Sequence, residues 1–410
     1  MPTGLRVTTR PVPDPGDLVT LLPDPDSPTC WVREGDGLVG WGEVARFTTS
    51  GPNRFAEAET WWRSFTARLD VRDEIGIPGT GPVAFVSFAF GDSSPGSVLV
   101  VPRVVVGRRD GRAWITQFSV GDGPGAVHRL EPVIRPTRRL RYRDGQLPVG
   151  AYRRAVAEAV RRMRAGTVRK VVLAHDLLVT GDQRFDPRFL LTGLSRRYPS
   201  CWSFAVDGLV GATPELLVHR MGHTVRSRVL AGTAWADDGH DADLTQRLLG
   251  STKNREEHEL AVASVAAALE PLCTRLDTPG TPTVLDLPNV SHLASDVTGE
   301  LNPDEPAGLL RLAEALHPTA AVGGTPRWAA LALIAELEGM DRGRYAGPVG
   351  WVDAAGDGEL GIALRCAHLD GPVARLFAGC GIMPESDPDQ EVREAAAKLA
   401  AIRQALEGVG

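Results

Sequence analysis

Apolar positions recur along the chain with two different spacings, and the spacing changes near residue 150. In the first third they fall in short valine-rich and aromatic runs at 30–47, 82–90 and 97–118. These runs contain or are interrupted by glycine and aspartate pairs, the residues that favour tight turns between strands. We therefore predict β-hairpins over the first third of the chain.

Beyond residue 150, helical spacing alternates with further strand-like runs. Apolar residues between 152 and 163 recur every three or four positions, and Gly166 follows, which predicts a helix. The last helix is well marked, because Asp387, Pro388 and Gln390 form a capping pattern at its start. Helices are also predicted over 187–198, from 253 to about 273, and over 305–316, 326–339 and 388–407, with strands over 170–179, 202–220, 348–353, 359–369 and 373–380.

The order of these elements predicts the fold class. Strands outnumber helices and do not alternate with them regularly, which favours α+β layers over a doubly wound parallel sheet. We divide the chain into a β-rich N-terminal half at 1–122, a Gly-, Pro- and Arg-rich crossover at 123–149, and a catalytic region at 150–407. We expect all three to belong to a single large domain.

Composition excludes several classes of function. The net charge is −6, and no arginine cluster is interleaved with aromatic residues, so a nucleic-acid partner is not expected. The sequence has neither a signal peptide pattern nor a long apolar run, which predicts a cytoplasmic protein without a membrane segment. The five cysteines are odd in number and lack CxxC spacing, so they indicate neither a disulfide framework nor a zinc site.

Lysine is rare in this chain. Of 45 basic residues only Lys170, Lys253 and Lys398 are lysines, and the rest are arginines. The two cations differ most in acidity, because a desolvated lysine can release its proton near neutral pH and act as a base, whereas arginine cannot. The three lysines could also be present by chance. Each of them lies in a dense polar segment, however, so we favour functional roles for all three.

Two helix edges carry clustered carboxylates. On the last helix Glu391, Glu394 and Lys398 share one edge, and a predicted turn at 379–381 lies just before that helix with glycines at both ends. A solvated Glu394–Lys398 ion pair is the ordinary alternative, but the glycines allow an anion to approach backbone N–H groups. A second acidic edge lies at 254–259, and together the two edges could hold Mg²⁺. Acidic first turns also occur simply because they compensate the helix dipole.

Glu215 is a lone carboxylate beside a run of apolar residues at 216–218. Apolar surroundings raise the pKa of a carboxyl toward the range that suits a general acid. By itself, Glu215 could equally be an ordinary turn residue.

Together these segments resemble the chorismate-utilising enzymes, and among them most closely the isochorismate synthases. The resemblance covers about 145–405 and is looser over the N-terminal third. Eight segments carry it in the family's order: Lys170-Val-Val-Leu-Ala-His, Gly211-Ala-Thr-Pro-Glu-Leu-Leu, Leu230-Ala-Gly-Thr, Lys253-Asn-Arg-Glu-Glu-His, His317-Pro-Thr-Ala-Ala-Val-Gly-Gly-Thr-Pro, Tyr345-Ala-Gly-Pro-Val-Gly-Trp, Ala363-Leu-Arg-Cys-Ala, and Ala378-Gly-Cys-Gly-Ile with Glu391-Val-Arg-Glu.

The resemblance implies a catalytic pair and a metal site. Lys170 would take a proton from the water that attacks C2 of chorismate, and Glu215 would protonate the departing C4 hydroxyl. Glu257 and Glu394 would bind Mg²⁺, with Glu391 acting beside them through water. The cofactor expected is therefore Mg²⁺ and the partner is the small molecule chorismate.

The resemblance also implies how the substrate is held. Arg365 would bind the pyruvyl carboxylate, the N–H of Gly379 would bind the ring carboxylate, and Lys398 would contact a substrate anion. Lys253 would orient the glutamate-bearing helix. Further substrate contacts are implied at Ala321, Tyr345, Gly232 and Thr233. His175 and Ala320 depart from the family pattern and are expected at the pocket wall.

The residues at two positions indicate which branch of the family the chain resembles. Lysine at position 170 resembles the members that use water as nucleophile, and Ala231 lacks the nucleophilic lysine that aminodeoxychorismate synthases often carry there. We therefore expect an isochorismate synthase for menaquinone or siderophore biosynthesis, acting as a monomer or weak homodimer. A salicylate synthase, or a chorismate-binding subunit of a glutamine-dependent synthase, remains an alternative. The fold implied is two large antiparallel sheets packed face to face, with helices outside and the site in the cleft.

Overall fold

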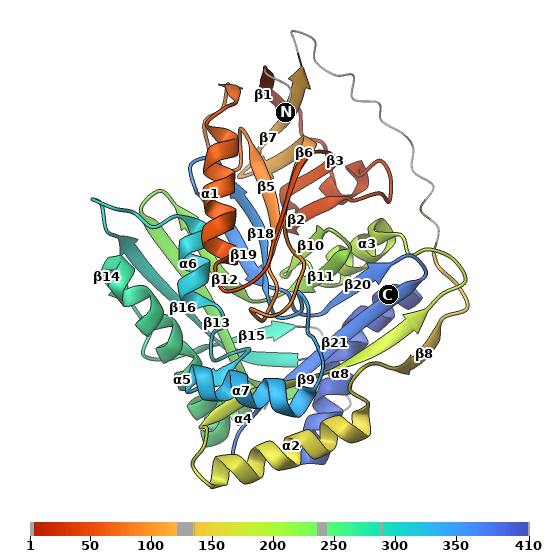
Figure 1. Ribbon diagram of the computed structural model, residues 1–410, viewed down its shortest axis with the longest axis vertical. Coiled ribbons are helices and arrows are strands. Elements are labelled where there is room, and N and C mark those ends of the chain that lie inside the picture. Colours follow the sequence, from red (N-terminus) through yellow and green to blue (C-terminus); the bar gives the residue numbers. More distant parts are fainter. Residues whose placement is uncertain (1–3, 121–133, 135, 236–243, 288–289, 409–410) are drawn as a thin grey trace.

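The strands form one hydrogen-bonded network that divides into two sheets at the long strand β6 (Ser97–Arg109). The computed structural model describes residues 4–120, 134, 136–235, 244–287 and 290–408 (Figure 1). Along one side, β6 pairs with β3 (Asp36–Thr49); along the other it pairs first with β5 (Val83–Ser87) and then with β7 (Arg112–Val120). The two sheets therefore diverge from a shared N-terminal region, which supplies strands to both.

The first sheet passes from β6 through β3 toward the strand that carries Lys170. Its strands are antiparallel except for the parallel pair β1–β4. Its order is β4 (Asp70–Asp73), β1 (Leu5–Val12), β7, β6, β3, β2 (Thr29–Arg33), β10 (Trp202–Val206), β11 (Leu209–Thr213), β20 (Cys366–Asp370), β21 (Val373–Ile382) and β9 (Lys170–Thr180), with β8 (Arg141–Asp144) and the short β17 (Gly324–Thr325) on the outer edge of β9.

The second sheet passes from β6 through β5 and is antiparallel throughout. Its order is β6, β5, β18 (Pro348–Asp353), β19 (Gly358–Ile362), β12 (Leu216–Met221), β13 (Thr224–Trp235) and β16 (Val290–Leu301), with β14 (Cys273–Asp277) and β15 (Thr283–Leu287) on the far edge of β16.

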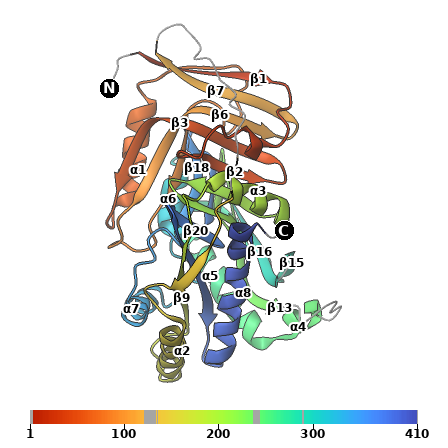
Figure 2. The same ribbon diagram turned by 90° about the vertical axis from the view of Figure 1, so that its right-hand side faces the viewer.

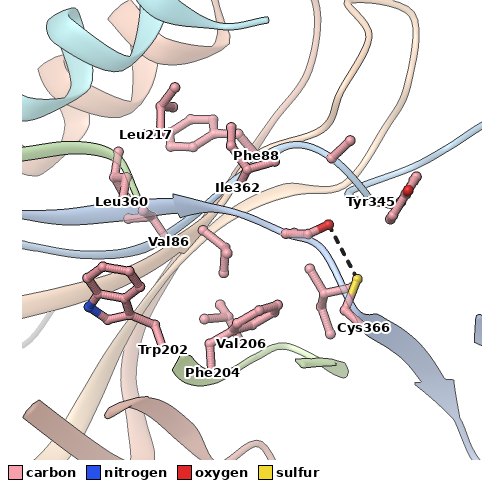
Figure 3. Close-up of a cluster of buried hydrophobic side chains, with 14 of the residues drawn as sticks. Val86, Phe88, Trp202, Phe204, Val206, Leu217, Tyr345, Leu360, Ile362 and Cys366 are labelled. Carbon is pink, nitrogen blue, oxygen red and sulfur yellow. Dashed lines mark hydrogen bonds between the residues drawn. The ribbon is translucent and has the colours of Figure 1, made fainter. Parts of the chain in front are cut away.

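Apolar side chains from both sheets meet in a common core (Figure 3). Phe204 of the first sheet and Val86 and Ile362 of the second are fully buried there. Apolar side chains must fill the layer between the inner faces of two packed sheets. The valine-rich runs of the first third of the chain supply many of them. Tyr345 and Cys366 lie at the end of this cluster (Figure 3).

Helices cover the outer faces and the diverging ends of the sheets (Figure 2). The helices α2, α3 and α8 pack on the first sheet, α5 and α6 on the second, and α7 on β9. The helices are α1 (Arg54–Thr66), α2 (Val149–Arg164), α3 (Pro187–Arg197), α4 (Leu244–Gly250), α5 (Thr252–Leu269), α6 (Leu309–Leu316), α7 (Arg327–Glu338) and α8 (Pro388–Glu407), with short 3-10 helices at Leu18–Leu21 and Glu270–Leu272. The expected α+β fold with two face-to-face antiparallel sheets in a single domain is confirmed.

The ends of α8 follow from its sequence. The Asp387 side chain accepts a hydrogen bond from the backbone N–H of Gln390, as the capping pattern predicts, and Gly408 ends the helix with a left-handed φ of 68°. Ala395, Leu399 and Ile402 form its buried stripe.

Several predicted elements are wrong in detail. The run 359–369 is two strands, β19 and β20, because the chain turns from one sheet to the other at Arg365, where φ is 48°. The run 202–220 is likewise three strands. Helix α1 was not predicted, although Phe55, Ala58 and Trp62 recur at helical spacing on its buried side. The helix predicted over 326–339 begins one residue later, at Arg327, with Pro326 at its N-cap position.

The expected crossover at 123–149 lies only partly within the described residues. Residues 121–133 and 135 fall outside them, and the remainder contains β8 and the start of α2. Among the described residues, no helix is long and apolar enough to cross a membrane.

Candidate active site

The first predicted catalytic residue, Lys170, begins β9 and is completely buried. Its Nζ lies 3.1 Å from Oε1 of Glu257 on α5, at ion-pair distance but without the geometry of a hydrogen bond. The structure thus brings together two residues 87 positions apart, one expected as the base and the other as a metal ligand.

Glu215 and Arg365 lie where the chain passes between the two sheets. Glu215 separates β11 of the first sheet from β12 of the second, and Arg365 separates β19 of the second from β20 of the first. Because the sheets diverge at these crossings, both side chains can face the space between them. Both line the same cavity.

The environment of Glu215 suits a proton donor. Its side chain is 5% exposed, and burial raises its pKa to about 8, although Lys170, Lys398 and Arg365 each oppose the shift. The carboxyl is therefore mainly protonated at neutral pH. This is the environment that the apolar neighbours of Glu215 predicted.

The three lysines each form an ion pair with one of the three predicted metal ligands. Lys170 pairs with Glu257, Nζ of Lys253 lies 3.1 Å from Oε1 of Glu391, and Nζ of Lys398 lies 2.7 Å from Oε1 of Glu394. The Lys253 pair joins α5 to α8, which agrees with the orienting role expected for that residue. Lysine is thus retained where a compact ammonium meets a site carboxylate.

The segment 379–381 is not a turn, as the sequence predicted, but the middle of β21, paired with β9. Ala174 of β9 stands opposite Gly379, and its N–H donates to Glu338 on the far edge of β9. Ala174 and Gly379 are therefore a non-hydrogen-bonded pair, so both backbone groups of Gly379 point away from β9. Its carbonyl accepts a hydrogen bond from Lys398 Nζ at 3.0 Å. Binding of a ligand anion by its N–H stays a prediction.

Gly381 allows the Lys170–Glu257 contact. A Cβ at this position would lie 2.1 Å from Oε1 of Glu257 and 3.3 Å from Cε of Lys170. Any larger residue here must displace the Glu257 carboxylate.

A β-bulge shapes the opposite wall. The register of β13 and β16 shifts between Ala231 and Thr233, and the bulged residue Gly232 has φ of 76°. A Cβ on Gly232 would lie 2.9 Å from the carbonyl oxygen of Asn254 on α5. Glycine therefore lets α5 approach closely and turns Thr233 toward the cavity.

These walls enclose a cavity that opens to solvent on one side. Most of the predicted site residues line it, namely Glu215, Gly232, Thr233, Glu257, Ala321, Tyr345, Arg365, Gly379, Glu394 and Lys398. The predicted residues Lys170 and Glu391 lie behind this lining. His175 and Ala320 were expected near the pocket wall; neither lines the cavity itself, but His175 stands opposite the lining residue Ala378 and Ala320 precedes the lining residue Ala321. The His175 ring packs on the ring of Tyr152.

Two lining residues were missed by the sequence reasoning. His292 on β16 contacts Arg365, and Arg342 forms a buried ion pair with Glu338 while donating to the carbonyl oxygen of Val172 on β9. His292 has no spacing signal, whereas Arg342 stands four residues after its partner Glu338, a spacing that could have marked the pair. Only the fold brings each to the site.

The carboxylates fit a hard divalent cation. Glu391 and Glu394 place ligand oxygens within 4.8 Å of each other and of Cys380 Sγ. Glu257 and Glu394 line the cavity, whereas Glu391 is 1% exposed and accepts hydrogen bonds from Lys253 and Ser386. Oxygen ligands of this kind suit Mg²⁺. Burial raises the pKa of the Cys380 thiol well above its usual value, so it stays protonated and is a poor ligand.

Comparison with known proteins points to one family. A family model described as chorismate binding enzyme matches residues 24–407. The chain is 40% identical over 343 residues to the putative isochorismate synthase MenF of Mycobacterium tuberculosis, covering 80% of this chain and 87% of that protein.

Two solved structures share the fold along nearly the whole chain. One is a putative 2,3-dihydroxybenzoate-specific isochorismate synthase from Bacillus anthracis, with a TM-score of 0.77, 30% identity, and coverage of 94% of this chain and 97% of the other. The second is the menaquinone-specific isochorismate synthase of Escherichia coli, with a TM-score of 0.81, 26% identity, and coverage of 98% and 95%.

Proposed function

The chain belongs to the chorismate-binding enzymes, and we propose that it is an isochorismate synthase that converts chorismate to isochorismate with Mg²⁺ as cofactor. Its product would serve menaquinone or siderophore biosynthesis. The observation that carries the proposal is a cavity lined by the protonated Glu215 and the guanidinium of Arg365, with the buried Lys170 directly behind the lining residue Glu257. Water addition and hydroxyl loss need these two opposite proton transfers.

In the proposed reaction, Lys170 Nζ accepts a proton from a water molecule, and the water oxygen bonds to C2 of the ring. The two ring double bonds shift, and the C4–O bond breaks. The Glu215 carboxyl gives its proton to the departing oxygen, which leaves as water. Lysine suits the first step because it can exist as a neutral amine, which arginine cannot.

The substrate's two carboxylates fix its orientation in this proposal. Arg365 is half-buried and forms no ion pair with an acid among the described residues, so its guanidinium can bind the pyruvyl carboxylate. The N–H of Gly379 is placed to donate to the ring carboxylate. Lys398 adds positive charge beside it.

Mg²⁺, when bound by Glu257 and Glu394, would hold the ring carboxylate and draw electron density from the ring, with Glu391 supporting the site from behind.

The direct test is incubation of the purified chain with chorismate and Mg²⁺, followed by chromatographic identification of the product. Isochorismate formed in buffer free of ammonia is the expected result. Pyruvate released without a second enzyme would instead identify a salicylate synthase. No conversion of chorismate would contradict the proposal.

A further inference from the structure

The substrate-binding guanidinium of Arg365 is held by a histidine on the opposite sheet. An Nη atom of Arg365 lies 3.1 Å from Nε2 of His292, and the other terminal nitrogen lies 3.9 Å from Cys201 Sγ. His292 is on β16, where it stands directly opposite Thr233 of β13, just after the Gly232 bulge. Its Nδ1 lies 3.3 Å from the Thr233 hydroxyl oxygen. One imidazole thus connects two cavity walls.

The direction of both hydrogen bonds follows from the chemistry of the groups. A guanidinium has only donors, so Nε2 of His292 must accept from Arg365. An imidazole that accepts at Nε2 is neutral and carries its hydrogen on Nδ1, which can donate to the Thr233 hydroxyl as well as to the backbone carbonyl of Gly232. Burial, together with the charges of Arg365 and Lys398, lowers the pKa of His292 well below its usual value and keeps this neutral form.

The same logic fixes the Thr233 hydroxyl. Its oxygen receives the His292 hydrogen, so its own hydrogen is directed elsewhere, and Thr233 lines the cavity. The hydroxyl can therefore donate to a ligand anion. A single neutral histidine would set both Arg365 and Thr233 as donors facing the same space.

We propose that His292 is a positioning residue that aims Arg365 and the Thr233 hydroxyl at the anionic groups of the substrate. The inference rests on the proposed function, because it takes chorismate as the anion. The alternative is that His292 is a buried core histidine whose hydrogen bonds only stabilise the fold.

Two amide substitutions separate the two hydrogen bonds. His292→Gln puts a carbonyl oxygen near the Nε2 position and can keep the acceptor for Arg365. His292→Asn places its amide near Nδ1, where it can still donate toward Thr233, and leaves Arg365 without its acceptor. His368→Asn, at an exposed position on β20, is the matched control.

We expect His292→Asn to raise KM for chorismate about tenfold or more while kcat changes by less than about threefold, since a lost charge-assisted hydrogen bond is worth about 1.5–3 kcal/mol. His292→Gln is expected to keep KM within about threefold, and His368→Asn to match the wild type. In an Arg365→Gln background, His292→Asn should add little, because the two changes act through one contact.

Unchanged KM in His292→Asn, or a loss of kcat alone, would overturn the inference. So would full additivity with Arg365→Gln. If His292→Asn does not fold, as judged by circular dichroism, Thr233→Val decides: a raised KM supports the positioning role, and an unchanged KM refutes it. A wild type that does not consume chorismate would reject the proposed function instead, so the two failures are distinguishable.

Discussion

Replacing Gly381 with alanine tests the geometry around Lys170 most sharply. The added Cβ would lie 2.1 Å from Oε1 of Glu257, and real contacts of this kind essentially never fall under 3.0 Å. The carboxylate must therefore retreat by about an ångström, because it is the flexible end of a side chain while Gly381 is fixed in a paired strand.

A displacement of that size should lower the reaction rate strongly and change the folding stability little. A reacting or coordinating group misplaced by about 1 Å can lower the rate about a hundredfold, which corresponds to about 2.7 kcal/mol. We expect Gly381→Ala to reduce kcat/KM for chorismate by that order and to weaken the response to Mg²⁺. The melting temperature should change by only a few degrees, since the Glu257 side chain can rotate away.

The assay is steady-state conversion of chorismate over a range of Mg²⁺ concentrations. Gly280→Ala is the matched control, because a Cβ there meets no atom within 4 Å, and its activity should equal that of the wild type. Activity of Gly381→Ala within about threefold of the wild type would refute the idea that the Glu257 position matters.

Five further outcomes are expected. Lys170→Arg and Lys170→Met should both abolish isochorismate formation, and turnover by either in the same assay would remove Lys170 as the base. The wild-type kcat/KM should fall as pH rises through about 8, because Glu215 loses its proton there, and Glu215→Gln should lack that limb in a pH–rate profile. Between pH 4.5 and about 8 the unfolded chain loses the Glu215 proton while the folded protein keeps it, so the free energy of unfolding should fall as pH rises over that range; denaturant melts at several pH values check this. Chelation with EDTA should stop turnover and added Mg²⁺ should restore it, and full activity after chelation would exclude the metal. Glu338→Gln should destabilise the fold by about 3–5 kcal/mol in urea titrations, because Arg342 is left buried without its carboxylate, and an unchanged midpoint would contradict that role.

Much of the site could be predicted because its residues lie in short segments with strong local signals. The scarcity of lysine singled out three positions, and each proves to pair with a glutamate of the predicted metal site. The apolar neighbours of Glu215 predicted its burial and raised pKa. The capped start of α8 predicted which edge of that helix carries Glu391 and Glu394.

What could not be predicted depends on contacts between distant strands. The glycines at 379 and 381 have the composition of a turn, but β9 supplies a pairing partner that extends β21 through them. The strands β19 and β20 are separated at Arg365 because the chain passes there from one sheet to the other. No local sequence pattern predicts that passage. His292 has no spacing signal at all, since its partners Arg365 and Thr233 lie 73 and 59 residues away.

The central claim is that water attacks C2 while the C4 hydroxyl leaves, with Lys170 and Glu215 as base and acid. The most direct measurement is turnover of chorismate in water labelled with oxygen-18, followed by mass spectrometry of the isochorismate formed. The account predicts one oxygen-18 atom per product molecule, at the C2 hydroxyl. Product without the label, in which the original hydroxyl oxygen is retained, would contradict it.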